Sequence, residues 1–185
     1  MTHRGLFVGR FQPLHIGHLR AIRWILDRVD ELIIAIGSAQ YSHTLQNPFT
    51  AGERLEMIRA SLIDDGIDLS RIITVTIPDI HVHSLWVRLV VSLSPRFHVV
   101  YSNEPLTRRL FEEEGFTVED IPFFDREIYS ATEVRRRILE DGDWRSLVPE
   151  AVAKLIDEFK GVERMKNLAR TDRVEEPKPG NMLGI

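Results

Sequence analysis

The residues with the clearest chemical use form one short segment, Gly9-Arg10-Phe11-Gln12-Pro13-Leu14-His15-Ile16-Gly17-His18. The segment follows an apolar run and opens a run with helical spacing, so His15 and His18 stand at the start of a helix. A helix N-terminus exposes free N–H groups and a partial positive charge. Imidazoles three residues apart share a face there and can donate hydrogen bonds to phosphate oxygens. The segment therefore predicts a site for the phosphate groups of a nucleotide.

Two other interpretations of the histidine pair remain open at this point. Histidines are also zinc ligands, but a zinc-binding helix usually spaces them four apart and adds a glutamate. Here they are three apart and no third ligand is near, so we expect no metal bound by the protein itself. The pair can also simply cap and solvate the end of the helix. We favour the phosphate site, because the two histidines surround a glycine directly after a strand.

The elements that must position this segment alternate between strands and helices. Apolar or β-branched runs predict strands at residues 5–9, 32–36, 72–77, 97–101 and 117–123. Helical spacing predicts helices at 16–29, 50–65, 84–93, 105–114, 130–140 and 149–160, and a last one up to Arg170. Such alternation indicates an α/β fold with a parallel sheet. Sites in these folds lie at the carboxyl ends of the strands, which is where the histidine segment stands.

Two helix starts carry the pattern of a capping box, in which a hydroxyl and a carboxylate cap each other's backbone N–H groups. The first joins Thr50 to Glu53, and the second joins Ser130 to Glu133. Arg54 follows the first pattern directly. The loop before this helix has the uncharged Gln46, which offers no cation to a phosphate, so Arg54 is the candidate for that contact instead.

The bulk composition excludes several classes of protein. The chain has 185 residues and a net charge of -4, which argues against a mainly nucleic-acid-binding protein. It has no cysteine, so disulfides and thiolate metal sites are excluded. No apolar run is long enough for a membrane helix, and the first strand starts too early for a signal peptide. We expect a cytoplasmic protein that binds neither a membrane nor a nucleic acid.

The chain divides into three expected parts. Residues 1–142 should form the α/β domain, and residues 143–171 should form a C-terminal helical segment packed on it. Residues 172–185 hold two prolines, two glycines and scattered charges without periodicity, so we expect a disordered tail.

Two segments resemble the signatures of a known superfamily. GRFQPLHIGH resembles the HxGH signature of the nucleotidyltransferases, and SATEVR at 130–135 resembles their ISSTxxR signature, with Tyr129 and Ala131 in place of the usual Ile and second Ser. Within the superfamily, the run from Gly37 to Arg54 is similar to the archaeal-type nicotinamide mononucleotide adenylyltransferases. The resemblance implies a Rossmann-like parallel sheet of about five strands in the order 3-2-1-4-5. Helices should cover both faces, with a helical appendage at the C-terminus.

The same resemblance implies an enzyme that joins ATP to nicotinamide mononucleotide and releases NAD and pyrophosphate. The implied catalytic residues are His15, His18 and Arg135. His18 should contact the α-phosphate, His15 the neighbouring phosphate, and Arg135 the departing pyrophosphate. The implied ATP site also includes Arg10, Phe11, Asn103, Ser130, Thr132 and Arg136. Arg136 points about 100° away from Arg135 on an ideal helix, and a solvated basic face is an alternative for it.

For nicotinamide mononucleotide, the resemblance implies Ser38, Asp79, Ile80 and Trp86. Trp86 should stack on the nicotinamide ring, a sound cation–π arrangement, although a place in the core of its helix is almost equally expected. The implied cofactor is Mg²⁺, held mainly by the phosphates. The implied assembly is a homo-oligomer, by resemblance a hexamer.

Three alternative functions differ from this interpretation. Another transferase of the superfamily, acting on flavin mononucleotide or transferring a cytidylyl group, would share the histidine site and differ in the acceptor pocket. A nucleotide sensor without catalysis would keep only the binding site. An NAD-dependent dehydrogenase would need a G-x-G-x-x-G segment after the first strand, which this chain lacks, as it lacks a P-loop.

Overall fold

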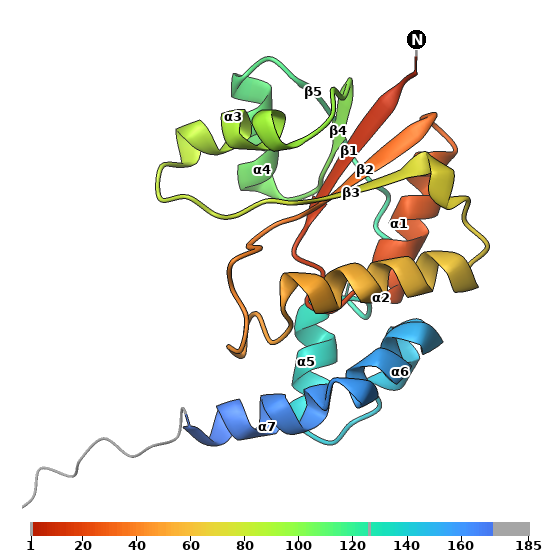
Figure 1. Ribbon diagram of the computed structural model, residues 1–185, viewed down its shortest axis with the longest axis vertical. Coiled ribbons are helices and arrows are strands. Elements are labelled where there is room, and N and C mark those ends of the chain that lie inside the picture. The colour runs from red at the N-terminus through yellow and green to blue at the C-terminus, as the bar shows by residue number, and fades with distance from the viewer. Residues whose placement is uncertain (1, 126, 172–185) are drawn as a thin grey trace, which may run out of the picture.

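Five parallel strands form the sheet of the computed structural model, which describes residues 2–125 and 127–171. They are β1 (Arg4–Gly9), β2 (Glu31–Ile36), β3 (Ile72–Thr76), β4 (Val99–Tyr101) and β5 (Thr117–Glu119). Their order is β3-β2-β1-β4-β5, which confirms the predicted topology. The carboxyl ends of β1, β2 and β3 therefore open at one edge of the sheet, below the strands in Figure 1.

Helices cover both faces of the sheet, as predicted (Figure 1). Helices α1 (Ile16–Leu26) and α2 (Ala51–Asp64) pack on the face that carries Phe7 and Ile34. Helices α3 (His83–Leu93) and α4 (Pro105–Glu113) pack on the face that carries Leu6 and Ile33. Because neighbouring strand residues point to opposite faces, a strand buried on both sides needs an uninterrupted apolar run.

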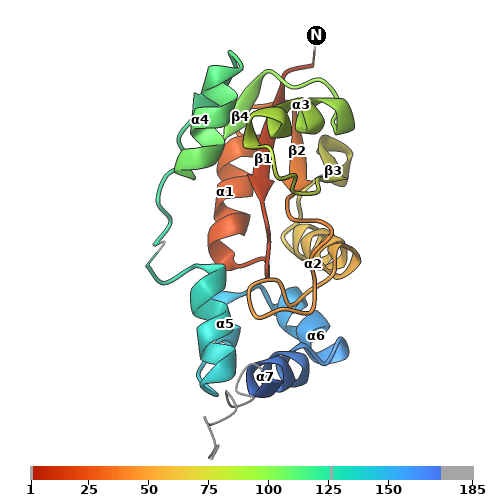
Figure 2. The same cartoon turned by 90° about the vertical axis from the view of Figure 1, so that its left-hand side faces the viewer.

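The C-terminal helices lie beyond the carboxyl ends of the strands (Figure 2). They are α5 (Ala131–Leu139), α6 (Glu150–Glu158) and α7 (Gly161–Thr171), and two short 3-10 helices span Leu69–Arg71 and Arg145–Leu147. Val152 and Ile156 of α6 belong to the same core cluster as Phe49 and Met57. The predicted disordered tail at 172–185 lies outside the described residues. None of the described helices combines the length and the apolarity that crossing a membrane requires.

Several predicted elements are shorter in the structure. The strand predicted at 97–101 begins at Val99, and the one predicted at 117–123 ends at Glu119. Beyond Glu119 the backbone of Ile121 bonds to the side chain of Asn103 instead of to β4, which ends the strand pairing. The helix predicted at 16–29 ends at Leu26.

Candidate active site

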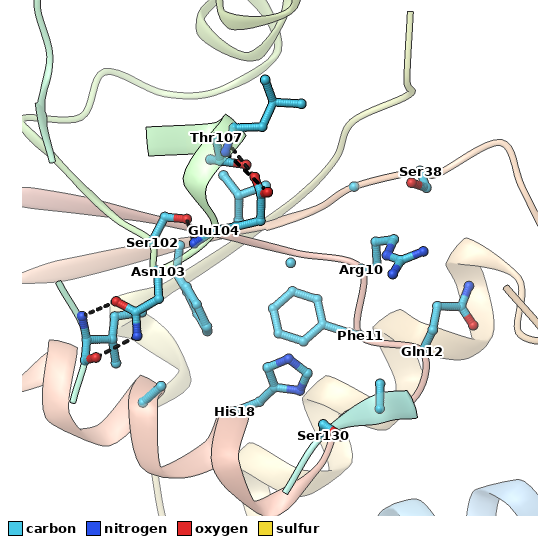
Figure 3. A pocket seen from close by; sticks show the side chains of 18 of the residues that line it. Arg10, Phe11, Gln12, His18, Ser38, Ser102, Asn103, Glu104, Thr107 and Ser130 are labelled. Carbon is cyan, nitrogen blue, oxygen red and sulfur yellow. Dashed lines mark hydrogen bonds between the residues drawn. The ribbon is translucent and has the colours of Figure 1, made fainter. Parts of the chain in front are cut away.

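A cavity of about 850 Å³ lies at the carboxyl edge of the sheet. This volume is within the range of small-molecule sites. Its walls come from the turn between β1 and α1, the loop after β3, the start of α4 and the start of α5. In Figure 3, His18 and Phe11 lie in the middle of the view, Arg10 and Ser38 to one side and Asn103 to the other. Every residue predicted for the site lines this cavity except Arg54 and Arg136.

Helix α1 begins with a cap made by its two histidines. Nδ1 of His15 accepts a hydrogen bond from the backbone N–H of His18, and Nδ1 of His18 accepts one from that of His15, each at 3.3 Å. The ring centroids are 3.6 Å apart. This is the reciprocal geometry of a capping box, which usually joins a serine or threonine to a glutamate or glutamine. The histidines therefore both cap the helix and line the cavity, two interpretations that the sequence kept apart.

The cap also determines which nitrogen of each ring carries the proton. Because Nδ1 is an acceptor in both rings, a neutral ring holds its proton on Nε2. Burial lowers the pKa of His15 to about 3. Burial, and then the neighbouring His15, lower the pKa of His18 well below its ordinary value. Both rings are therefore neutral in the free protein, and each offers one Nε2–H donor. An arriving phosphate would favour their protonation.

Gly17 and Phe11 keep the histidine rings in place. A Cβ at Gly17 would lie 3.0 Å from Nδ1 of His15 and 3.2 Å from the Cβ of Tyr129, so a side chain here would press on this cap. The Phe11 ring is 1% exposed, and its centroid lies 4.7 Å from that of His18. Phe11 therefore supports His18 with its side chain, which leaves its backbone as the part that a ligand can contact.

Arg10 and Arg135 bring positive charge to the histidine end of the cavity. Burial, and then the charge of Arg10, lower the pKa of Arg135 to about 10, so Arg135 stays charged at neutral pH. Its Nη1 donates to the carbonyl of Gln12 at 2.8 Å, which ties α5 to the turn after β1. Neither guanidinium pairs with a carboxylate within residues 2–125 and 127–171. Two cations without a carboxylate, beside a helix N-terminus, favour a bound anion.

The start of α5 adds two hydroxyls to the same end. Ser130 caps the helix, because its Oγ accepts a hydrogen bond from the backbone N–H of Glu133 at 3.2 Å. Thr132 accepts one from Nη2 of Arg135 at 3.4 Å. Both residues line the cavity, and their contact with ATP stays a prediction.

The predicted capping box of α5 is only half formed. The carboxylate of Glu133 accepts hydrogen bonds from Arg136 and Arg137 at 2.7 Å and does not reach back to Ser130. Arg136 also pairs with Glu140. The structure thus turns Arg136 away from the cavity, as its helical angle suggested, and gives no support to its expected contact with ATP.

The loop after β3 forms another part of the cavity wall. Oγ of Ser38 donates to Oδ2 of Asp79 at 2.7 Å, and Ile80 lies beside them in the wall. Trp86 is half-buried, its ring lies at 78° to that of Phe111 with a centroid distance of 5.9 Å, and it also lines the cavity. Trp86 therefore packs in the core beside its helix and also faces the cavity, and its stacking on the nicotinamide ring stays a prediction.

Two further histidines, for which no role was expected, also line this part of the cavity. His81 and His83 are exposed at the start of α3, and both belong to the cavity wall. Their signal in the sequence was weak, because histidines in an exposed loop are common and nothing local showed which way the loop folds.

Asn103 lines a third side, at the end of β4. Its Oδ1 accepts from the backbone N–H of Ile121 at 2.9 Å, and its Nδ2 donates to the carbonyl of Ile121 at 2.6 Å, as the dashed lines in Figure 3 show. Next to it, the carboxylate of Glu104 caps α4 through the backbone N–H of Thr107 at 2.6 Å. Asn103 therefore shapes the wall by holding the backbone of Ile121, and one N–H of its amide is left for a ligand.

Two residues organise the site through hydrogen bonds that the sequence did not indicate. Gln12 holds the loop before α2, since its amide bonds to both the N–H and the carbonyl of Phe49, at 3.0 and 2.8 Å. Arg54 is fully buried and donates to the carbonyls of Arg10, Gly37 and Ser38. It does not line the cavity, so the direct phosphate contact that we expected of it has no support.

Together, the fold and this site define an α/β nucleotide-binding protein whose cavity has a cationic end and an aromatic end. A family model described as cytidylyltransferase-like matches residues 6–137. A nicotinamide-nucleotide adenylyltransferase of Saccharolobus solfataricus is 52% identical over 92% of this chain and 99% of its own length. The one of Pyrococcus horikoshii is 51% identical over 90% and 89%. The chain therefore belongs to the cytidylyltransferase-like family and, within it, to the nicotinamide-nucleotide adenylyltransferases.

Solved structures agree on the fold. A bifunctional NMN adenylyltransferase/ADP ribose pyrophosphatase of Francisella tularensis, in complex with AMP and a manganese ion, superposes with a TM-score of 0.74. It is 22% identical, and the match covers 92% of this chain and 54% of the other. This chain thus spans about half of that bifunctional protein.

Proposed function

We propose that this protein transfers the adenylyl group of ATP to nicotinamide mononucleotide, which forms NAD and pyrophosphate. The observation that most supports this reaction is the paired histidine cap next to Arg10 and Arg135, within one cavity that also holds Trp86. The names of relatives about half identical over nearly the whole chain agree with it.

The chemistry needs positioning and positive charge more than it needs a base. An oxygen of the nicotinamide mononucleotide phosphate forms a bond to the α-phosphorus of ATP. The bond from that phosphorus to the bridging oxygen breaks, and its electron pair leaves with pyrophosphate. The attacking phosphate has a second pKa of roughly 6 and is largely ionised at neutral pH. The protein therefore has to align two anions and neutralise their charge.

The geometry suggests a division of these tasks. His18 donates its Nε2–H to the α-phosphate, and His15 donates to the neighbouring phosphate, while the cap holds both rings fixed. Arg10 and the backbone at Phe11 bind the triphosphate from the β1 side. Ser130, Thr132 and Arg135 bind it from α5, where Arg135 stabilises the departing pyrophosphate.

The acceptor binds at the other end of the cavity. Trp86 offers an aromatic surface for the pyridinium ring. The Ser38–Asp79 hydrogen bond joins the loops after β2 and β3, and it orders the wall in which Ile80 lies. A hydroxyl and a carboxylate suit the ribose hydroxyls of a nucleotide.

Magnesium fits this site as a companion of ATP. No group of three or more metal-ligating side chains occurs within the part of the chain that the structure describes. Mg²⁺ keeps several waters and binds phosphate oxygens with at most one or two carboxylates, so it needs no protein cage. When bound to the phosphates, it would add charge neutralisation to that of Arg10 and Arg135.

A direct assay tests the proposed reaction. The purified protein is incubated with ATP, Mg²⁺ and nicotinamide mononucleotide, and both NAD and pyrophosphate are measured. Parallel reactions replace the acceptor with flavin mononucleotide, or the donor with CTP and the acceptor with a phosphorylated alcohol. We expect equal amounts of NAD and pyrophosphate in the first reaction only. If no NAD forms, the proposed function is wrong, and if no pyrophosphate forms in any reaction, the protein is a nucleotide sensor.

The homo-oligomeric state, by resemblance a hexamer, stays a prediction. The cytoplasmic location stays a prediction as well. Light scattering of the purified protein gives its mass in solution, and six times the mass of one chain is the expected value.

A further inference from the structure

Arg54 is the one fully buried charged side chain in the described core, and the proposed reaction leaves it without a task. It stands in the first turn of α2. Its Nη1 donates to the carbonyls of Arg10 at 2.9 Å and Gly37 at 2.8 Å, and its Nη2 donates to that of Ser38 at 3.2 Å. Its Nε donates to the carbonyl of Thr50 at 3.2 Å. One guanidinium thus joins the turn after β1, the loop after β2 and the start of α2.

The two segments that Arg54 joins are strained and functional. Phe11 and Ser38 have φ angles of 51° and 49°, in the left-handed region that residues other than glycine rarely adopt. Strain of this kind persists only where the surrounding structure holds it. The side chains next to these positions are Arg10, at the phosphate end, and Ser38 itself, bonded to Asp79. A small shift between the two segments would move one substrate relative to the other.

The charge of Arg54 has no partner of its own. No carboxylate lies within ion-pair distance among the described residues, although Asp79 is near enough to favour the charged form. Burial, and then the charge of Arg10, lower the pKa of Arg54 to about 10, so it is still charged at neutral pH. A buried charge that is compensated only by carbonyl dipoles is costly. The phosphates of bound substrates would supply the missing negative charge.

We propose that Arg54 is a positioning residue for the adenylyl transfer proposed above. Its guanidinium sets the separation of the turns after β1 and β2, and its unpaired charge is balanced by the phosphates of bound substrates. Arg54 then acts through Arg10 and Ser38, without touching either substrate. This inference rests on the proposed function.

The chain offers a matched control at the far edge of the sheet. Arg71 also donates to three backbone carbonyls, those of Leu26 and Val29 at 2.6 Å and that of Asp30 at 2.8 Å. These carbonyls lie between the end of α1 and the start of β2, and Arg71 does not line the cavity. Replacing Arg71 therefore removes the same kind of bonds without affecting the site.

The test compares Arg54→Met and Arg54→Lys with Arg71→Met and Arg71→Lys in the full-length protein. For each variant, the thermal midpoint, kcat, KM and the dissociation constant of pyrophosphate are measured. We expect Arg54→Met to lower kcat/KM and the affinity for pyrophosphate, each by about tenfold or more. Arg54→Lys keeps the charge and loses the planar guanidinium with its several fixed donors. The affinity for pyrophosphate should therefore stay within about threefold, while kcat falls about tenfold. The Arg71 variants should lose thermal stability yet keep both quantities within about twofold.

The inference is overturned if a folded Arg54→Met protein keeps kcat/KM and pyrophosphate affinity within about twofold of the unaltered chain. If Arg54→Met does not fold, an unchanged kcat in Arg54→Lys overturns it. If neither folds, hydrogen exchange of the unaltered protein decides. Pyrophosphate should then slow exchange at residues 50–54, which lie outside the cavity wall, and leave 69–72 unchanged; equal exchange at 50–54 overturns the inference. The pyrophosphate measurements remain valid even if no NAD is formed, so a failure of the proposed function is distinguishable.

Discussion

Helices α1 and α2 begin with the same reciprocal cap built from different side chains. In α2, Oγ1 of Thr50 accepts from the N–H of Glu53 at 3.1 Å, and Oε2 of Glu53 accepts from the N–H of Thr50 at 2.9 Å. In α1, the imidazoles of His15 and His18 exchange the equivalent bonds at 3.3 Å. Because the backbone pattern is shared, the difference between the helices lies in what each cap leaves available.

We call the α2 cap closed, because its carboxylate is paired within the protein, and the α1 cap open, because its remaining donors are available to a ligand. The carboxylate of Glu53 also accepts hydrogen bonds from both Nη atoms of Arg164 at 2.7 Å, so its charge is used to join α2 to α7. The α1 cap is neutral, and its first turn has no acidic residue. Its Nε2–H groups bond to no described residue. A helix N-terminus keeps its attraction for an outside anion only when its own cap supplies no negative charge.

Converting the α1 cap into a copy of the α2 cap should have the largest effect. In His18→Glu, the new carboxylate can still cap the N–H of His15, so the thermal midpoint should stay within a few degrees of the unaltered value. However, it removes a donor and adds a like charge where phosphate binds. We expect adenylyl transfer to fall by about 10³-fold or more, measured as the rate of NAD formation. Nearly full turnover in this variant would show that the neutrality of the cap is unimportant.

Removing the ring without adding a charge should have a smaller effect. In His18→Ala, the rate of NAD formation should fall by about 10²-fold, the scale for losing one preorganised donor. One capping bond is lost as well, so the free energy of unfolding should drop by about 1 kcal/mol, measured by urea denaturation. Arg136→Ala serves as the control, because Arg136 lies outside the cavity and its loss should leave the rate within about twofold. A rate in His18→Ala equal to that of this control would remove His18 from the reaction.

The α/β fold and the location of the site were predictable from local patterns, whereas the strand order came from the resemblance to the nucleotidyltransferases. The apolar run at 32–36 needs cover on both faces, and the glycine between His15 and His18 follows a strand directly. Helix starts after parallel strands meet at one edge, so both signatures had to converge there. The meeting of both signatures in one cavity follows from these two rules.

The bonds that fix the site were not predictable, because they join side chains to distant backbone. Gln12 holds Phe49, which is 37 positions away, and Arg54 reaches back 44 positions to Arg10. No periodicity or capping pattern marks such a pair. Local patterns also failed where two partners compete, since Glu133 binds Arg136 and Arg137 in place of completing the cap of Ser130. The expectation that Arg136 contacts ATP had the same weakness. A signature shows the spacing of its residues and does not show the partner of each charge.

Breaking the closed cap should affect stability and leave activity intact. Glu53→Gln keeps an oxygen that can cap Thr50 and removes only the charge that pairs with Arg164. The two side chains are 16% and 18% exposed, so the pair is largely shielded from water. We expect the free energy of unfolding in urea to fall by about 2 kcal/mol, less than for a fully buried pair. NAD formation should stay within about twofold, and a loss as large as that in His18→Ala would show that the α2 cap also serves the site.

The smallest predicted difference is that the two caps lose stability in different pH windows. Burial lowers the pKa of His15 to about 3, whereas its ordinary value is 6.5. The unfolded chain therefore binds more protons below pH 6.5, and the free energy of unfolding decreases as the pH falls through this value. For Glu53 burial alone would raise the pKa, but the hydrogen bonds from Arg164 and Thr50 hold it below its ordinary 4.5. Its contribution is present above pH 4.5 and is lost only below it.

Unfolding of the free protein, followed at a series of pH values, separates these two windows. Between about pH 8 and pH 6, His15 should account for a loss of about 1 kcal/mol, which His15→Asn should abolish while its amide still caps α1. Glu53→Gln should flatten only the part of the curve below pH 4.5. Saturating pyrophosphate should reduce the loss in the upper window, because a bound anion favours the protonated rings. If His15→Asn and the unaltered protein lose the same stability between pH 8 and pH 6, the α1 cap is not the neutral, open cap inferred from its geometry.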